Sequence, residues 1–299
     1  MGFMDTEKKS LLYVHLSALL LGFLAPALKV IPSTAGGIVL GRSLIQSIAI
    51  MLLLIWMGRP LLLRHASHWW QVLALGILQS VQWWAFIYAV QTVSVAVALI
   101  TTFAFPLWLA LLEPLFFSEK FTRSNLVASL AILAGLVLIA TEGLPQSSLP
   151  LADRSGENVA WTGFAAGMAS GVLVALIMLL SRKAVQELSS LSINLYQSLV
   201  SVLLFALFFR ELGGLLVLDW LRLAYIAIVF SAVPYVLITL SVRTLSAHRV
   251  GAIVSLEPLY GVILAAFLLD EIPSLLTTLG GAFILGASAW ETLRKTSCS

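Results

Sequence analysis

VRTLSAHRVGAIVSLEPLYGVILAAFLLDE, residues 242–271, has a counterpart in the first half of the chain, VQTVSVAVALITTFAFPLWLALLEPLFFSE, residues 90–119. The two stretches align without a gap at a constant offset of 152 positions, which pairs Pro106 with Pro258. An offset of about half the 299-residue chain is typical of an internal duplication. We therefore expect two copies of one folding unit.

Each copy is long and apolar enough to cross a bilayer, and each contains a proline, Pro106 or Pro258. Proline inside a helix removes one backbone hydrogen bond and kinks the helix. In lipid the freed carbonyl needs another partner, so such breaks are tolerated beside protein or a water-filled cavity. Matched breaks in matched halves are typical of a transport site. The alternative is a pair of kinks without function.

The composition is that of a membrane protein. The chain is 60% hydrophobic and 10% charged, with a mean hydropathy of +1.03, whereas soluble domains carry roughly 25% charged residues. The net charge of +3 comes from loop lysines and arginines, so it reports orientation and does not indicate nucleic-acid binding. Cys298 is the single cysteine, which leaves no disulfide and no metal-ligand cluster. We expect an all-α protein in the lipid bilayer, with no metal and no cofactor.

Apolar runs predict ten transmembrane helices. They cover residues 11–28, 37–58, 69–89, 95–117, 124–141, 159–181, 191–209, 220–241, 249–269 and 274–292. The segment between the fifth and sixth runs is rich in Pro, Ser, Gly and charge, as linkers are. The expected organisation is a five-helix repeat at 11–141, an extracytoplasmic linker at 142–158 and a second five-helix repeat at 159–294.

The lysines and arginines predict the orientation. With the N-terminus in the cytoplasm, twelve lie on inner segments and four on outer segments, and Arg42 lies inside a helix. This bias places both termini in the cytoplasm. Because each half has an odd number of helices, the second half enters the membrane from the opposite side. Two inverted five-helix repeats are the plan of many secondary transporters, whose site lies near the midplane between the repeats.

These features resemble a known family. The duplicated unit, with FPLWLALLEPLFFSEK in the first copy and LEPLYGVILAAFLLDE in the second, is similar to EamA-type members of the drug/metabolite transporter superfamily. The resemblance covers nearly the whole chain. It implies ten helices, cytoplasmic termini and movement of small metabolites or drugs, often outward. It does not indicate which solute is moved.

Polar stripes mark two corresponding helices. Arg42 and Gln46 lie four residues apart on one face, and the offset pairs them with Asn194 and Ser198. Asn194, Gln197 and Ser198 also share a face. Two inward stripes predict a hydrophilic cavity for substrate. Arg42 is expected to hold an anionic group such as a carboxylate; the alternatives are snorkelling to the interface or a structural ion pair.

Two glutamates are candidates for proton coupling, because ionisable groups inside membrane helices are costly and usually functional. Glu257 lies at mid-span beside Pro258 and is also a candidate substrate contact. Glu113 precedes Pro114 but lies nearer the cytoplasmic end and does not match Glu257 in the repeat. We favour Glu257. For both, the alternative is a hydrogen bond that holds helices together.

A third helix pair is expected to wall the cavity. Gln79, Gln82 and Trp83 share one face, and the offset pairs Trp83 with Tyr235 and Gln82 with Pro234, a third proline break. The aromatic rings could stack on an organic substrate or a cation, or face lipid instead. These candidates complete a predicted substrate-binding set of Arg42, Gln46, Gln79, Gln82, Trp83, Asn194, Gln197, Tyr235 and Glu257.

The functional expectation is a secondary transporter that exports amino acids or related small organic solutes by alternating access. The chain lacks H-E-x-x-H, Walker A and G-x-S-x-G motifs, so we do not expect an enzyme. The alternative is a flippase or a membrane-embedded enzyme acting on lipid-linked substrate. A glycine row at Gly163, Gly167 and Gly171 suits packing within the bundle or between two copies, so the chain is expected to be a monomer or weak homodimer. The expected location is the bacterial inner membrane.

Overall fold

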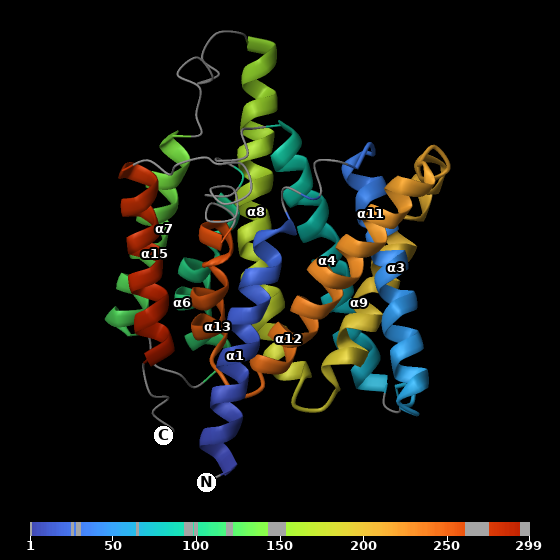
Figure 1. Cartoon of the computed structure of the whole chain (residues 1–299), viewed down its shortest axis with the longest axis horizontal. Helices are drawn as coiled ribbons and strands as arrows, with labels where there is room; N and C mark the ends of the chain where they lie inside the picture. The colour runs from blue at the N-terminus through green and yellow to red at the C-terminus, as the bar shows by residue number, and fades with distance from the viewer. Residues whose placement is uncertain are drawn as a thin grey trace. The chain divides into compact units, whose positions relative to one another are not determined.

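The computed structural model describes residues 2–24, 27, 31–63, 66–92, 98, 101–117, 122–142, 154–260 and 275–293. Every regular element in those ranges is helical, as expected (Figure 1). The elements that lie mainly in the first predicted repeat are α1 (Gly2–Gly22), α3 (Ala35–Trp56), α4 (Ala66–Thr92), α6 (Phe105–Phe116) and α7 (Arg123–Glu142). Those that lie mainly in the second are α8 (Arg154–Ala184), α9 (Ser190–Leu204), η1 (Ala206–Phe208), α10 (Phe209–Leu212), α11 (Val217–Ala227), η2 (Ile228–Ala232), α12 (Val233–Ser241), α13 (Ala247–Val254) and α15 (Leu275–Leu293).

Within the described residues, four helical segments are long and apolar enough to cross a membrane: Ala35–Trp56, His68–Thr92, Trp161–Ala184 and Val217–Ser241. A fifth would be the pair Ser190–Leu204 and Ala206–Leu212, which is bent by 62°. Several other predicted spans are described only in part, and residues 143–153 of the predicted linker lie outside the described residues. The number of ten spans therefore stays a prediction.

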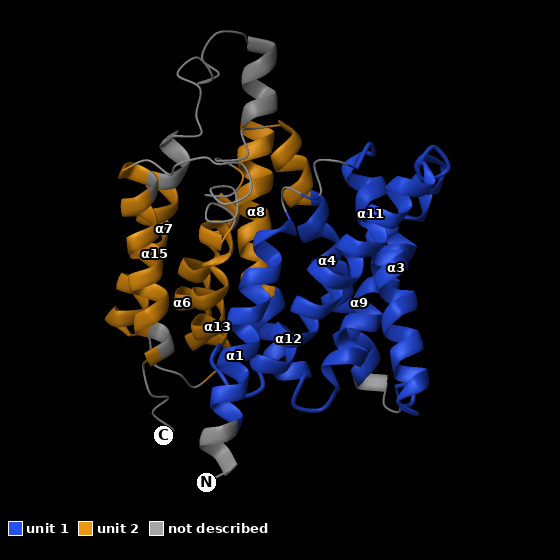
Figure 2. Ribbon diagram, in the orientation of Figure 1, with its two compact units in different colours: residues 1–84, 177–246 blue, residues 85–176, 247–299 orange. Residues whose placement is uncertain are grey.

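The chain divides into two compact units, each of which takes helices from both predicted repeats (Figure 2). Unit 1 comprises residues 1–84 and 177–246, and unit 2 comprises residues 85–176 and 247–299. In unit 1, α3 packs on α9 and α1 packs on α12; in unit 2, α7 packs on α15 and α6 packs on α13. The duplication seen in the sequence is thus distributed over both units.

Small residues let helices approach closely in both units. A Cβ atom added at Gly76 on α4 would lie 2.5 Å from Cβ of Val200 on α9 in unit 1. In unit 2, a Cβ atom at Gly171 on α8 would lie 2.8 Å from the Thr101 carbonyl oxygen. Real Cβ atoms do not come this close to other atoms, so these crossings depend on glycine. Gly171 belongs to the predicted glycine row, and its close neighbours are residues of unit 2.

The helices are interrupted at equivalent places in the two repeats. A two-residue turn at 103–104 precedes α6, and a two-residue turn at 255–256 follows α13; the repeat offset pairs the two turns. Pro106 and Pro258 come just after the turns, in the first turn of the resumed helix, where a missing N–H is tolerated. Pro234 follows the π-helical segment η2. Such segments are frequent at functional sites.

Candidate functional site

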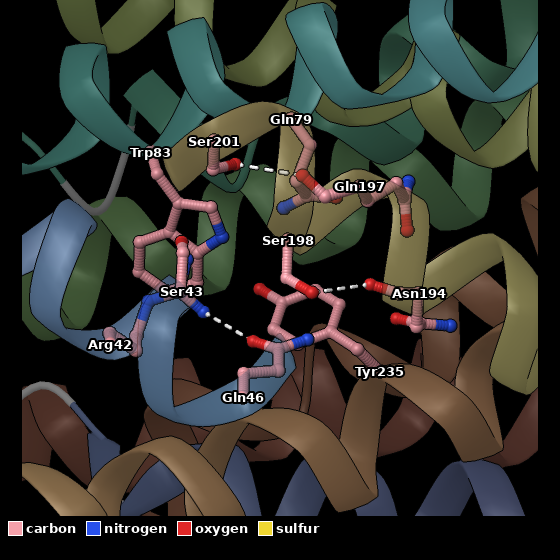
Figure 3. Close-up of a pocket in the computed structure, with 10 residues that line it drawn as sticks. All are labelled: Arg42, Ser43, Gln46, Gln79, Trp83, Asn194, Gln197, Ser198, Ser201 and Tyr235. Carbon is pink, nitrogen blue, oxygen red and sulfur yellow. Dashed lines mark hydrogen bonds between the residues drawn. The ribbon is translucent and has the colours of Figure 1, made fainter. Parts of the chain in front are cut away.

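Unit 1 contains a small polar pocket (Figure 3). Four helices line it: α3, α4, α9 and α12. The lining residues are Arg42, Ser43, Gln46, Gln79, Trp83, Asn194, Gln197, Ser198, Ser201 and Tyr235. Among these described residues Arg42 is the one with a formal charge at neutral pH, and none is acidic.

The pocket exists because local sequence patterns place polar side chains on the facing sides of packed helices. Arg42 and Gln46 are one turn apart on α3, and Asn194, Gln197 and Ser201 repeat at helical spacing on α9. Both helices begin at side-chain N-caps that fix their first turns: Thr34 accepts from the Gly37 N–H, and Ser189 accepts from the Ser192 N–H. The α3–α9 contact then brings the two stripes together.

Arg42 is buried, with 2% of its surface exposed, and its partners are neutral. Nη1 donates to Oε1 of Gln46 at 3.3 Å, and the guanidinium carbon lies 4.0 Å from the centroid of the Trp83 ring (Figure 3). The Nε–H group is buried and has no hydrogen-bond partner among the described residues. The aromatic face stabilises the cation in part. A buried charge without an opposite charge is still costly, so this arrangement favours binding of an anion.

The opposite wall offers amides and hydroxyls. Asn194 Nδ2 donates to the Ser190 carbonyl at 2.9 Å and to Thr239 Oγ1 at 3.1 Å, which fixes the side chain. Ser201 Oγ lies 2.7 Å from Ser80 Oγ and joins α9 to α4. Gln197 is buried and its side chain lines the pocket. The wall thus combines fixed groups with an amide that lines the pocket.

An aromatic pair closes another side of the pocket. The rings of Trp83 and Tyr235 meet edge to face, with centroids 5.9 Å apart and an interplanar angle of 70°. Edge-to-face pairs of this kind are favourable beyond the area that they bury. Since Tyr235 lies on α12, directly after η2, a change in the π-helical segment would move this ring relative to Trp83.

Comparison with known proteins agrees with this architecture. A family model described as the EamA-like transporter family matches residues 8–141 and again residues 161–290. The chain belongs to the EamA-like transporter family. The resemblance expected from the sequence is therefore confirmed, and this family member is an integral, multi-pass membrane protein.

Two further similarities accompany the family match. An uncharacterized transporter from Archaeoglobus fulgidus is 26% identical over 212 residues, which are 69% of this chain and 71% of that protein. A protein of known crystal structure superposes with a TM-score of 0.80 at 18% identity, over 96% of this chain and 97% of its own. At that identity the second similarity shows the fold alone.

In this EamA-family chain the pocket gathers seven of the nine residues predicted to bind substrate. They are Arg42, Gln46, Gln79, Trp83, Asn194, Gln197 and Tyr235. Gln82 is buried next to the pocket, where its Oε1 accepts from Nε2 of Gln79 at 3.4 Å. Glu257 belongs to unit 2, where it is partly buried and comes directly after the turn at 255–256. Ser43, Ser198 and Ser201 line the pocket as well, and their helical spacing from Gln46 and Asn194 is the signal that identifies them.

Glu113 has a different environment from Arg42. Its side chain is buried in unit 2, where Oε1 accepts from the Ala247 N–H at 2.7 Å and Oε2 accepts from the His248 N–H at 3.1 Å. Ala247 and His248 are the first residues of α13, so the carboxylate caps the positive end of that helix. This is the structural alternative that the sequence left open for Glu113.

A hydrogen-bonded cluster surrounds this cap. The His248 Nε2 atom lies 3.0 Å from Ser129 Oγ and 3.2 Å from the Asn125 carbonyl, and Ser129 Oγ lies 3.0 Å from the Pro106 carbonyl. The cluster therefore joins α13, α7 and the start of α6 within unit 2. The described residues contain no group of three or more His, Cys, Asp or Glu that could hold a metal ion.

Proposed function

We propose that the chain is a secondary transporter of small organic solutes and that the pocket of unit 1 is its substrate site. The observation that carries the proposal is Arg42, a buried cation with neutral partners in a pocket otherwise lined by amides, hydroxyls and aromatic rings. Ionisable residues in membrane spans typically mark substrate pathways. The solute class is amino acids or related small molecules, and the direction is export. The protein moves its solute without changing it chemically.

The lining of the pocket supports small polar solutes, because amides, hydroxyls and one guanidinium supply most of it. The alternative is a flippase or membrane enzyme that acts on a lipid-linked sugar, whose long lipid chain such a polar lining does not suit. No observation among the described residues favours that alternative.

The proposed mechanism is alternating access between inverted repeats. At the turns at 103–104 and 255–256 and at the segment η2, the helices are already interrupted. Few regular hydrogen bonds need to break for a helix to pivot there. We propose that these positions are the hinges, and that ten helices cross the bacterial inner membrane with both termini in the cytoplasm.

Cysteine labelling in intact cells tests this topology. In a Cys298→Ser background, Ser147→Cys in the predicted linker should react readily with a membrane-impermeant maleimide. Arg59→Cys, on the predicted cytoplasmic side, is the matched control and should react only after the cells are opened. Protection of residue 147 in intact cells would contradict the inverted-repeat arrangement.

We also propose that Glu257, rather than Glu113, couples transport to a proton. Both oxygens of Glu113 accept backbone hydrogen bonds at the start of α13, which suits a permanent structural carboxylate. Glu257 lies at an interrupted helix position, where local rearrangement is easier. Glu257→Gln should abolish gradient-driven transport and keep solute exchange. The assignment would be contradicted if Glu257→Gln kept normal gradient-driven transport while folded Glu113→Gln lost it.

The transport function itself is tested by counterflow in proteoliposomes. Vesicles containing the purified chain and loaded with unlabelled solute should accumulate labelled solute transiently, from a panel of amino acids, hydroxy acids and oxo acids. Protein-free vesicles are the control. Recovery of chemically unchanged label inside the vesicles supports transport, whereas conversion of the solute would indicate an enzyme.

A further inference from the structure

We infer that the pocket of unit 1 selects a small organic monoanion without an ammonium group, such as a 2-hydroxy or 2-oxo acid, over the corresponding amino acid. The inference rests on the proposed function and narrows its substrate class. It follows from the charges of the lining residues, from the contacts of Arg42 and from the groups that remain available to a ligand.

Arg42 is suited to bind the carboxylate of a ligand. Arg42 is 2% exposed, it is hydrogen-bonded to the neutral Gln46, and its buried Nε–H has no partner among the described residues. A guanidinium has five N–H donors in a planar fork that matches a carboxylate. A ligand carboxylate would engage unused donors and neutralise the buried charge. Charge-assisted hydrogen bonds of this kind are about twice as strong as neutral ones.

The pocket disfavours the ammonium group of an amino acid. No described lining residue is acidic, so the pocket supplies no charge to balance an ammonium. The Trp83 ring, a possible cation–π partner, already has the Arg42 guanidinium 4.0 Å from its centroid. An α-ammonium beside a carboxylate bound to Arg42 would therefore lose its water and feel repulsion from the guanidinium. The same pocket accepts a neutral hydroxyl or carbonyl at that position.

The pocket offers neutral partners to the hydroxyl or oxo group that replaces the ammonium. Gln197 carries a buried amide in the pocket lining, and an amide can donate to or accept from a ligand oxygen. Ser198 Oγ lies 2.8 Å from the Leu195 carbonyl, to which it donates, so its lone pairs can still accept a hydroxyl proton. Both neutral partners suit a hydroxyl, and an amide donor also suits an oxo group.

Isothermal titration calorimetry on the purified full chain in neutral-lipid nanodiscs tests the inference at pH 7. The ligands are 2-hydroxy-4-methylpentanoate, leucine and 2-hydroxy-4-methylpentanamide, which share one carbon skeleton. Lactate, alanine and lactamide form a smaller matched series. We expect the hydroxy acid to bind at least tenfold more tightly than the amino acid or the amide in at least one series. Equal or tighter binding of the amino acid or the amide, or no binding of either hydroxy acid, would overturn the inference.

Arg42→Gln tests whether Arg42 is the residue that distinguishes the charged hydroxy acid from the neutral amide. It should reduce the affinity ratio of hydroxy acid to amide from at least ten to about one. Arg59→Gln makes the same change at an exposed arginine of unit 1 and should leave the ratio unchanged. A ratio retained by Arg42→Gln would overturn the inference.

Counterflow of the same solutes in proteoliposomes separates the inference from the proposed function. Transport of leucine with no preference for the hydroxy acid would overturn the inference and leave the transporter function standing. Selective binding of the hydroxy acid without movement of any solute would support the inference and contradict the transporter function.

Discussion

Arg42 in unit 1 and Glu113 in unit 2 are both 2% exposed, yet their surroundings differ. The Glu113 carboxylate accepts two backbone N–H groups at the positive end of α13. The Arg42 guanidinium donates a hydrogen bond to Gln46 and lies over the Trp83 indole. Its buried Nε–H has no hydrogen-bond partner in the described part of the chain. A buried charge that the fold satisfies holds helices together, whereas one that the fold leaves without an opposite charge is suited to bind a ligand.

The difference predicts opposite effects of removing the two charges on stability. Glu113→Ala leaves the Ala247 and His248 N–H groups without their acceptor, at a cost of roughly 1–3 kcal/mol for each group. Thermal unfolding of the detergent-purified protein should therefore occur at a clearly lower temperature. Glu113→Gln keeps one acceptor oxygen and should lose less. Wild-type stability of Glu113→Ala would show that the cap is not structurally important.

Arg42→Met should leave the ligand-free protein as stable as wild type or slightly more stable. The substitution removes a cation–π contact of roughly 0.5–2 kcal/mol, but it also relieves an uncompensated buried charge. The net change should lie within roughly 1 kcal/mol of zero or favour the variant. The check is thermal unfolding without ligand, with Glu113→Ala measured beside it. A large loss of stability would mean that Arg42 is structural after all.

Trp83→Leu should weaken binding of the anion only slightly. The guanidinium carbon lies 4.0 Å from the centroid of the Trp83 ring. Without that ring the guanidinium is less well oriented, which should cost roughly 0.5–1 kcal/mol of binding free energy, or about a two- to fivefold weaker binding of the anion. Trp83→Phe keeps a ring and should lose less. Calorimetric titration with the hydroxy acid measures both variants, and tighter binding by Trp83→Leu would show that the indole competes with the ligand.

Helical periodicity was sufficient to predict most of the residues that line the pocket around Arg42. The i, i+4 pair of Arg42 and Gln46 and the stripe that includes Asn194 are local patterns, and the repeat offset indicated that the two stripes correspond. The pocket serines follow the same spacing. Gln82 shows the limit of that signal, because it is on the right face of α4 but is turned to Gln79 instead of lining the pocket.

The sequence could not predict the role of Glu113. Its hydrogen bonds to Ala247 and His248 join residues 134 and 135 positions apart, and no local pattern encodes such a contact. The interrupted helices were partly predictable: the prolines marked them, but the turns lie just before Pro106 and Pro258, because proline is accommodated in the first turn of the resumed helix. The division into two units that mix the repeats depends on tertiary packing alone.

The role proposed for Arg42 is to bind the anionic group of the transported solute. The most direct measurement is the initial rate of counterflow of labelled 2-hydroxy-4-methylpentanoate by Arg42→Met, Arg42→Lys and wild type, at equal amounts of folded protein in the vesicles. We predict at least a tenfold loss for Arg42→Met and nearly as large a loss for Arg42→Lys, because lysine lacks the planar fork. Arg59→Met, an equivalent change at an exposed arginine, should retain the wild-type rate. A wild-type rate for Arg42→Met would contradict the claim.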